Sequence, residues 1–313
     1  MTDRTPAPAS RVGGQGTGLA FAVGAYGLWG FLPGFFLLLA PASPWEIVAF
    51  RILMSLVFCV ILLTITRGWQ AFIGLSKQPR VLFTMGLAGV LIYINWQVFV
   101  LATLTGHVVE GSLGYFINPV ITVALGVVVL RERLRPLQWT AVGISVVAIL
   151  VIALGYGAFP WIALVLALSF GFYGFIKKRV GAQVDAISGL TLETAWLVPV
   201  AVVQLIVTAA TVGLTFGTVS TVHSLLMIAT GVITATPLLL FAAAARRLPL
   251  VALGLTQYLA PILQFLTGVF LLNEPMPVGR WVGFGLVWLA LALLTVDMIR
   301  AARAGRRASL PVA

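Results

Sequence analysis

The chain has 313 residues, of which 61% are hydrophobic and 9% charged, and its mean hydropathy is +1.10. Soluble globular domains carry about a quarter charged residues, so this composition indicates a protein that faces lipid. It excludes a cytosolic enzyme, a secreted disulfide scaffold and a nucleic-acid-binding domain. One cysteine, Cys59, permits no intrachain disulfide. We therefore predict an all-α integral membrane protein, and the net charge of +11 reflects where the basic residues lie rather than nucleic-acid binding.

Ten apolar runs follow one another along the chain, each close to the length of about 20 residues that a helix needs to cross the bilayer. The first five predicted transmembrane helices are 18–40, 45–66, 81–103, 107–130 and 136–154. The second five are 159–176, 188–212, 222–245, 250–272 and 279–299. We expect a disordered cytoplasmic tail over 1–17, which is polar and rich in Pro and Gly, and a basic cytoplasmic tail over 300–313.

The basic residues predict the orientation of these helices. With the N-terminus inside, 17 of the 19 Lys and Arg residues fall in cytoplasmic segments. The exceptions are Arg51, within the second predicted helix, and Arg280, in an outer segment. This pattern follows the positive-inside rule and predicts that both termini are cytoplasmic.

The chain contains an internal repeat. Residues 116–143 moved by 142 positions fall on 258–285, so that Pro119 meets Pro261 and Trp139 meets Trp281. Each half, 18–155 and 156–299, holds five predicted helices, and an odd number inverts the second half in the membrane. Inverted repeats are typical of secondary transporters. The alternative is an old duplication that survives in a protein with another role.

Several segments resemble the RarD branch of the EamA family, in the drug/metabolite transporter superfamily. They include GHVVEGSLGYFINPV (106–120), RERLRPLQW (131–139), TPLLLFAAAARRLPL (236–250) and TQYLAPILQFLTGVFLLNEPM (256–276). The resemblance implies ten helices in two EamA-like repeats, cytoplasmic termini, and export or exchange of small molecules across the bacterial inner membrane. Phe50 stands where the family pattern has a histidine before Arg51, so a proton role for that histidine does not carry over.

Two prolines at matching positions indicate where a transport site would lie. Pro119 and Pro261 lie near the middle of their predicted helices, and each leaves a carbonyl one turn earlier without its helical partner. We expect breaks in both helices, with polar neighbours near the substrate. These substrate-binding candidates are Tyr115, Asn118, Gln257 and Tyr258. The alternative is that the prolines kink the helices and only shape their packing.

Further candidates lie in the second and third predicted helices. Of the consecutive residues Asn95, Trp96 and Gln97, at most two can face one cavity, and we expect Asn95 and Trp96 to do so. Trp96 fits an anchor at the membrane interface equally well. Arg51 is expected either to bind an anionic group or to extend its side chain to the membrane surface.

Three carboxylates are candidates for proton coupling if burial raises their pKa toward neutrality. They are Glu46, Glu110 and Glu193. Ser43 and Glu46 also fit a helix-capping box, and Glu110 fits a simple helix start. Glu132 and Glu274, which match in the repeat, are expected to be capping or salt-bridge residues.

The sequence contains no GxxxxGK[ST], HExxH or GxSxG motif, so we predict no enzymatic activity, no metal and no cofactor. The predicted function is secondary active transport of a small amphipathic metabolite or drug across the bacterial inner membrane. It would export by alternating access, with proton or exchange coupling. Expected partners are the substrate, membrane lipid and possible coupling protons, with no nucleic acid, in a monomer or weak homodimer. The alternative is a lipid scramblase or membrane scaffold without small-molecule transport.

Overall fold

A computed structural model describes residues 11–130, 135–156, 159–180, 183–245, 247–248 and 256–308. These ranges fold into helices joined by short loops, and they contain no β-strand. The first half contains α1 (Arg11–Leu37), α2 (Pro44–Ile65), α3 (Trp69–Ser76), α4 (Pro79–Leu104), α5 (Val108–Leu130) and α6 (Pro136–Tyr156). The second half contains α7 (Trp161–Val180), α8 (Ala186–Thr211), α9 (Thr221–Ala245), α11 (Leu259–Leu266) with its π-helical continuation η1 (Thr267–Leu271), and α12 (Val278–Ala308).

The long helices follow the predicted ranges closely, with three differences. Helix α1 begins at Arg11 and α12 ends at Ala308, so both predicted tails are helical next to the membrane segment. A short helix, α3, occupies a segment that we expected to be a loop. The predicted range 250–272 is described only from residue 256 on, and Arg131, Glu132, Arg133 and Arg246 also lie outside the described residues.

Six of the described helices are long and apolar enough to cross a membrane, and three further apolar helices are shorter. Many large apolar side chains lie exposed on the outer surface, among them Phe83, Trp139 and Ile206. Water does not favour so much exposed apolar surface, whereas lipid does. The chain is therefore a multi-pass membrane protein.

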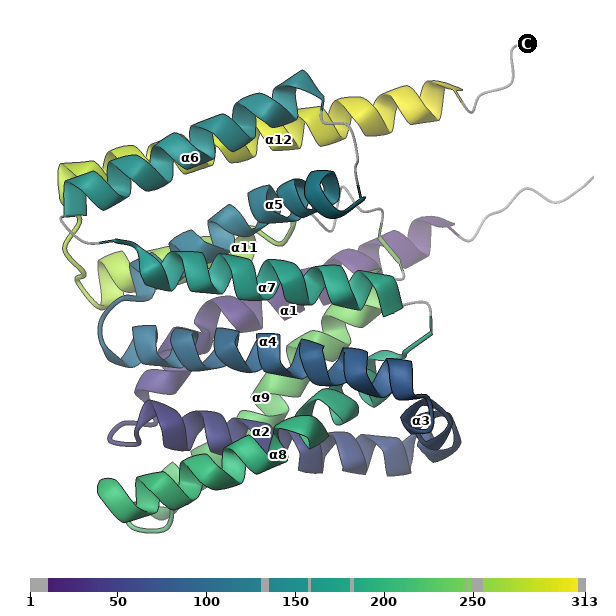
Figure 1. The fold of residues 1–313 in the computed structure, drawn as a ribbon, viewed down its shortest axis with the longest axis vertical. Helices are drawn as coiled ribbons and strands as arrows, with labels where there is room; N and C mark the ends of the chain where they lie inside the picture. The colour runs from purple at the N-terminus through teal and green to yellow at the C-terminus, as the bar shows by residue number, and fades with distance from the viewer. Residues whose placement is uncertain are drawn as a thin grey trace, which may run out of the picture.

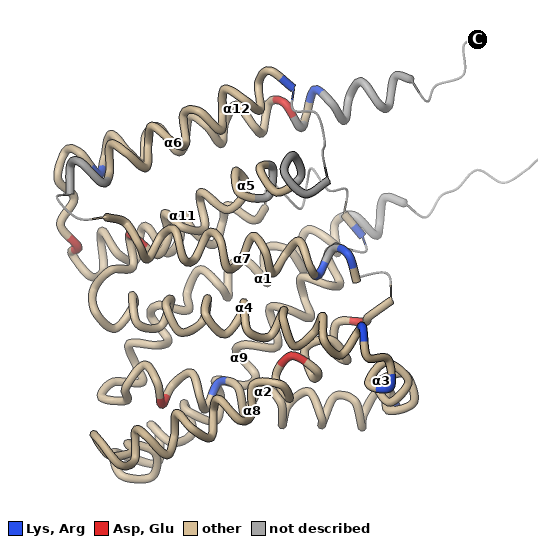
Figure 2. The backbone as a smooth tube through the Cα atoms, viewed as in Figure 1, with Lys and Arg blue, Asp and Glu red and all other residues tan. Residues whose placement is uncertain are grey.

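Most of the long helices run across the long axis of the molecule, and both described ends of the chain lie on the same side (Figure 1). We call this side the terminal face and the other end of the helices the distal face. Lys and Arg gather at the terminal face, whereas several acidic residues lie toward the distal face (Figure 2). Helices α2, α5, α7, α9 and α12 begin at the distal face, as the alternation of the chain requires.

The helices pack mostly against helices of the other half. Helix α1 packs against α9 and α11, and in the same way α7 packs against α4 and α5. Helix α2 packs against α9 as α8 packs against α4. The remaining large contacts join α2 to α8, α5 to α11 and α6 to α12, which are helices at the same place in each half.

Glycines allow two of these contacts to be very close. A Cβ on Gly231 of α9 would collide with the backbone carbonyl of Met54 in α2. A Cβ on Gly89 of α4 would lie 3.0 Å from the carbonyl oxygen of Glu193 in α8. Gly89 and Gly231 are 142 positions apart, the offset that relates the two halves of the sequence. Both glycines thus bring a helix of one half against the backbone of the other.

Candidate functional site

Arg51 lies inside the helix bundle, two turns from the distal end of α2. Ser43 caps the start of the helix, since its side chain accepts a hydrogen bond from the backbone N–H of Glu46, and Pro44 occupies the first turn. Arg51 is only 3% exposed, and its Nε donates to the hydroxyl of Thr234 in α9 at 2.8 Å. The alternative that Arg51 reaches the membrane surface is therefore wrong, because a partner in the other half holds it inside.

Two aromatic rings flank the guanidinium of Arg51. Its Cζ lies 4.4 Å from the ring centre of Trp96 and 5.4 Å from that of Phe36. Trp96 is 5% exposed, so it is not an anchor at the membrane interface. A cation over an aromatic face is attracted by the ring quadrupole, most strongly where water is excluded. Trp96 thus points into the helix bundle, as predicted, and lies beside Arg51.

Asn95, next to Trp96 on α4, connects three helices. Its Oδ1 accepts a hydrogen bond from the hydroxyl of Tyr115 in α5 at 2.8 Å. Its Nδ2 donates to the hydroxyl of Ser169 and to the carbonyl of Leu166 in α7, both at 3.2 Å. We call these residues the Arg51 cluster: Phe36, Arg51, Asn95, Trp96, Tyr115 and Thr234.

Gln97 faces away from this cluster, as helix geometry requires of the third consecutive residue. Its Oε1 accepts a hydrogen bond from Nε2 of Gln204 in α8 at 2.8 Å. The same amide nitrogen donates to the hydroxyl of Tyr93 at 2.9 Å. Gln97 therefore joins α4 to α8 and takes no part in the contacts around Arg51.

The proline region of the first half differs from the expectation. Helix α5 runs without interruption across Pro119, because the hydrogen bonds on either side of the missing one keep the helix together. Asn118 lies one turn beyond Tyr115, close to α7, where a Cβ on Gly171 would lie 3.4 Å from its Oδ1. The predicted break is thus not found in α5, while Tyr115 and Asn118 both face α7.

The proline region of the second half lies apart from the Arg51 cluster. Gln257 and Tyr258 form a turn before α11, and Pro261 is the third residue of that helix, where a missing N–H is tolerated. Tyr258 lines a cavity of about 370 Å³ together with Phe116 and Trp288. This cavity lies where α5, α11 and α12 meet. The structure therefore does not bring Gln257 and Tyr258 together with Arg51.

Three carboxylates connect the two halves at the distal face. The carboxylate of Glu46 accepts hydrogen bonds from the backbone N–H groups of Thr215 and Phe216 and from the Thr215 hydroxyl, at 2.9–3.1 Å. Glu110 accepts from the N–H of Ile162 at the start of α7, at 3.0 Å. Glu274 accepts from the N–H groups of Val108 and Val109 at the start of α5, at 2.6 and 3.0 Å. We call these contacts the distal bridges.

The distal bridges decide several of the expectations for acidic residues. Glu274 is a capping residue, as predicted, although the helix that it caps belongs to the other half. Burial raises the pKa of the Glu274 carboxyl, and the two backbone N–H groups lower it by less. Glu46 uses its carboxylate across the molecule instead of completing a capping box on its own helix. His107 is bound to the hydroxyl of Thr105 at 3.0 Å, while Glu110 turns to α7.

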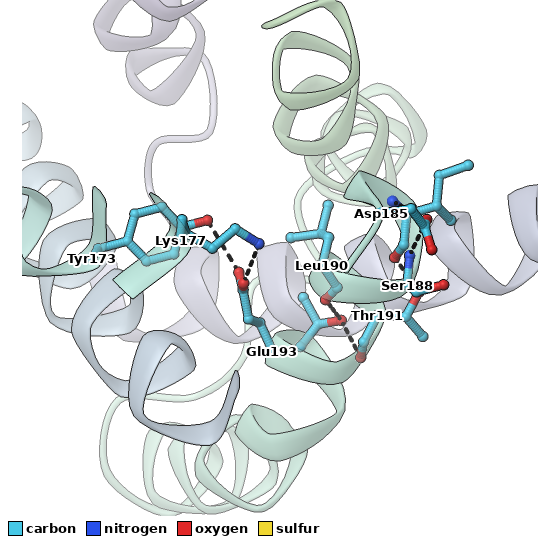
Figure 3. A network of polar contacts seen from close by, with 9 residues as sticks. Tyr173, Lys177, Asp185, Ser188, Leu190, Thr191 and Glu193 are labelled. Carbon is cyan, nitrogen blue, oxygen red and sulfur yellow. Dashed lines mark hydrogen bonds and ion pairs between the residues drawn. The ribbon is translucent and has the colours of Figure 1, made fainter. Parts of the chain in front are cut away.

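Glu193 is held in a different manner, by side chains of α7 (Figure 3). Its Oε1 lies 2.6 Å from Nζ of Lys177, and its Oε2 accepts a hydrogen bond from the Tyr173 hydroxyl at 3.2 Å. The side chain of Glu193 is 1% exposed and that of Lys177 is 29% exposed. Near the start of α8, Asp185 caps the N–H groups of Ile187 and Ser188, which fixes the helix that carries Glu193 (Figure 3).

Sequence spacing relates Arg51 and Glu193, two of the buried charged residues. Arg51 and Glu193 are 142 positions apart, the same offset as Pro119 and Pro261. Arg51 lies two turns from the distal end of α2, and Glu193 lies two turns from the terminal end of α8. Equivalent positions of the two halves thus carry opposite charges at mirrored depths in the bundle.

Comparisons with known proteins identify the family. The profile of the EamA-like transporter family matches residues 16–154. Protein RarD of Streptomyces exfoliatus is 47% identical over 292 residues, which make up 93% of this chain and 92% of that protein. Protein RarD of Escherichia coli (strain K12) is 39% identical and covers 90% of this chain and 95% of its own length. The chain belongs to the EamA family, in its RarD branch.

A further relative and a solved structure are also similar to this chain. An uncharacterized transporter of Vibrio cholerae is 37% identical, over 93% of this chain and 96% of that protein. A crystal structure at 18% sequence identity overlays with a TM-score of 0.58 and covers 92% of this chain and 99% of its own. This structural similarity shows a shared helical fold. The family names point to a membrane transporter rather than to an enzyme.

Within this EamA family member, the sequence alone did not indicate several partners of the candidate residues. Thr234 and Ser169 contact Arg51 and Asn95 from the other half, and no sequence pattern marks them. Tyr173 and Lys177 are four residues apart on one face of α7 and aim at Glu193. That spacing on an otherwise apolar helix was a usable signal, because i and i+4 share a face. A cavity of about 330 Å³ lined by His107, Glu110, Trp161 and other residues lies near the distal face.

Proposed function

We propose that the chain is a secondary active transporter that exports a small amphipathic metabolite or drug across the bacterial inner membrane by alternating access. The Arg51 cluster carries this proposal. Its hydrogen bonds from Arg51 to Thr234 and from Asn95 to Ser169 each join one half to the other. Buried polar groups at membrane depth are costly and mark functional sites. The polar groups of the Arg51 cluster lie between the two halves, where a movement of one half against the other would open a path for the substrate.

The proposed mechanism requires two inverted five-helix halves, ten transmembrane helices and cytoplasmic termini. The exchanged packing of α1 against α9 and α7 against α4 supports the repeat, because a two-fold axis relating the halves predicts this pairing. The equal spacing of Gly89 and Gly231 supports it independently. The Lys and Arg residues at the terminal face support a cytoplasmic location of that face.

Glu193 is the proton-coupling residue in this proposal. Glu46 and Glu110 are engaged with backbone N–H groups at the ends of helices. Glu193 is bound instead by the side chains of Lys177 and Tyr173, which can move with their helix. Protonation of Glu193 would neutralise it and release Lys177, whose side chain is partly exposed toward the terminal face. Helix α7, which packs on α4 and α5 of the other half, would then be less tightly held to α8.

The test is exchange and proton flux in liposomes that contain the purified protein and a pH-sensitive dye. Radiolabelled amino acids, organic acids, nucleosides and drugs are offered in counterflow, with Arg80→Gln as a control at an exposed cation. We expect at least one compound to exchange, Asn95→Ala to reduce that exchange, and Glu193→Gln to exchange without moving protons. Absence of exchange for every compound, together with rapid flipping of fluorescent lipids, would replace transport with lipid scrambling.

A further inference from the structure

Arg51 carries a buried positive charge that has no anionic partner in the described part of the chain. No described carboxylate lies within ion-pair distance of it; Glu193 pairs with Lys177, and Asp297 pairs with Arg135. Glu46 lies on the same helix, but its oxygens are bound to Thr215 and Phe216. A buried cation without a counter-charge is strongly disfavoured, and truly buried charges in proteins are paired.

The contacts of Arg51 leave part of its guanidinium available. Nε is bound to Thr234, and the plane lies near the rings of Trp96 and Phe36. Nη1 is buried and has no hydrogen-bond partner among the described residues. A guanidinium presents its N–H groups as a planar fork that matches the two oxygens of a carboxylate. No such anion lies beside Arg51 in the described part of the chain, and the carboxylate of a bound ligand fits this fork.

The surroundings of Arg51 indicate the rest of the ligand. The aromatic rings of Phe36, Trp96, Phe99 and Tyr115 make a series of contacts across this region. Asn95 and Tyr115 add neutral polar groups, which bond to each other. A single cation beside aromatic surface matches one negative charge on an apolar body, and it does not match a multiply charged anion.

We propose that Arg51 binds the carboxylate of the transported molecule, which is a small monocarboxylate with an aromatic or aliphatic body. This inference rests on the transport function proposed above and specifies its substrate class. Arg51 makes the charged contact, and Trp96 stacks beside it. Thr234 holds Nε from the other half, so binding of the anion also depends on how the halves are placed.

Matched acid and amide probes test this inference at pH 7 on the purified protein in a neutral detergent. The probes are phenylacetate, indole-3-acetate and octanoate, beside phenylacetamide, indole-3-acetamide and octanamide. Binding is measured as the concentration-dependent rise in unfolding temperature. We expect at least one acid to bind and its amide not to bind. Arg51→Gln should weaken acid binding about 30-fold or more, since a charged partner is lost, and Arg51→Lys should weaken it less. Arg80→Gln should bind as wild type does.

Several outcomes would overturn the inference. One is equal binding of acid and amide, and another is a preference for the acid that persists in Arg51→Gln. A third is a rise in unfolding temperature that phosphatidylglycerol alone produces and that Arg51→Gln loses, which would make a lipid phosphate the ligand. If Arg51→Gln does not fold, the acid and amide comparison in wild type and Arg51→Lys decides. Exchange of neutral compounds only, with no acid bound, overturns the carboxylate while transport stands. If an acid binds but no compound is exchanged, Arg51 still binds an anion, but the molecule is not transported and the transport function is refuted.

Discussion

The ion pair between Lys177 and Glu193 should show an asymmetric response to mutation. Lys177→Met leaves the Glu193 carboxylate in a site where its side chain is 1% exposed. Among the described residues, the Tyr173 hydroxyl at 3.2 Å is then its remaining hydrogen-bond partner. Glu193→Gln leaves Lys177, whose side chain is already 29% exposed and can reach water at the terminal face. Removing the lysine should therefore destabilise the protein more than removing the charge of the glutamate.

The exposed fractions set the magnitudes. Breaking a buried pair and leaving one charge uncompensated costs about 3–5 kcal/mol, so we expect about 3 kcal/mol for Lys177→Met. The partly exposed lysine is hydrated again, so we expect about 1 kcal/mol for Glu193→Gln, within the range of exposed pairs. The double variant contains no charge in the site, and it should be more stable than Lys177→Met by about 1–2 kcal/mol.

Equilibrium unfolding in mixed micelles, followed by circular dichroism, measures all four proteins in one cycle. Tyr173→Phe is the matched control, because it removes one hydrogen bond to the carboxylate and keeps the ion pair; it should cost about 2 kcal/mol. Equal losses for the two single variants, or a double variant with the sum of both losses, would show that burial of Glu193 does not govern the energy of the pair.

Three further predictions concern packing, titration and a polar contact. Gly231→Ala should destabilise the protein by about 1–3 kcal/mol, because the added methyl group pushes α9 away from the Met54 carbonyl. At the control position Gly27 an added Cβ meets no atom within 4 Å, so Gly27→Ala should be neutral or slightly stabilising. Similar effects of the two variants in unfolding assays would contradict the close approach of α9 to α2. Because burial raises the pKa of Glu274 above 4.5, its stabilisation is complete below that pH and is lost as the pH rises through the folded pKa. The stability advantage of wild type over Glu274→Gln should therefore shrink with rising pH. An advantage that grows with pH would show that folding lowers the pKa of Glu274 instead of raising it. Gln204→Leu should cost about 1–2 kcal/mol through two lost bonds to α4, and unchanged unfolding would show that these bonds contribute nothing.

Apolar run length predicted the helices well, because a helix in lipid must satisfy its own backbone and cannot be much shorter than the bilayer. The inward position of Arg51 was left open by the sequence, since a long side chain two turns from a helix end can turn either way. Thr234 decides it, and that residue is 183 positions away. No local sequence pattern indicates which helix lies opposite Arg51.

The carboxylates show a similar limit. Ser43 and Glu46 match the pattern of a capping box, and the Ser43 part is found. The Glu46 carboxylate binds Thr215 and Phe216 instead, because the loop between α8 and α9 presents free N–H groups to it. The prolines were a weaker guide than expected. Pro119 lies inside a continuous helix, and the roles of the candidate substrate-binding residues stay predictions.

The distal bridges have a consequence for how tightly such a transporter is sealed. Each bridge joins a carboxylate of one half to backbone N–H groups of the other, so any motion that parts the halves at the distal face breaks all three. A hydrogen bond to a charged group contributes roughly 1.5–3 kcal/mol, and the burial that raises the pKa of Glu274 offsets part of this, so the bridges together favour the closed form by roughly 3–5 kcal/mol.

A shift of about 5.5 kcal/mol separates a 1:99 population from a 99:1 population. An empty protein would thus open at the distal face only rarely, and a cargo must bind the open form preferentially to change that. Compounds that bind weakly would leave the barrier to ions and water intact. The same three carboxylates would then set a minimum affinity for cargo of any chemical class, and they would limit leakage between transport cycles.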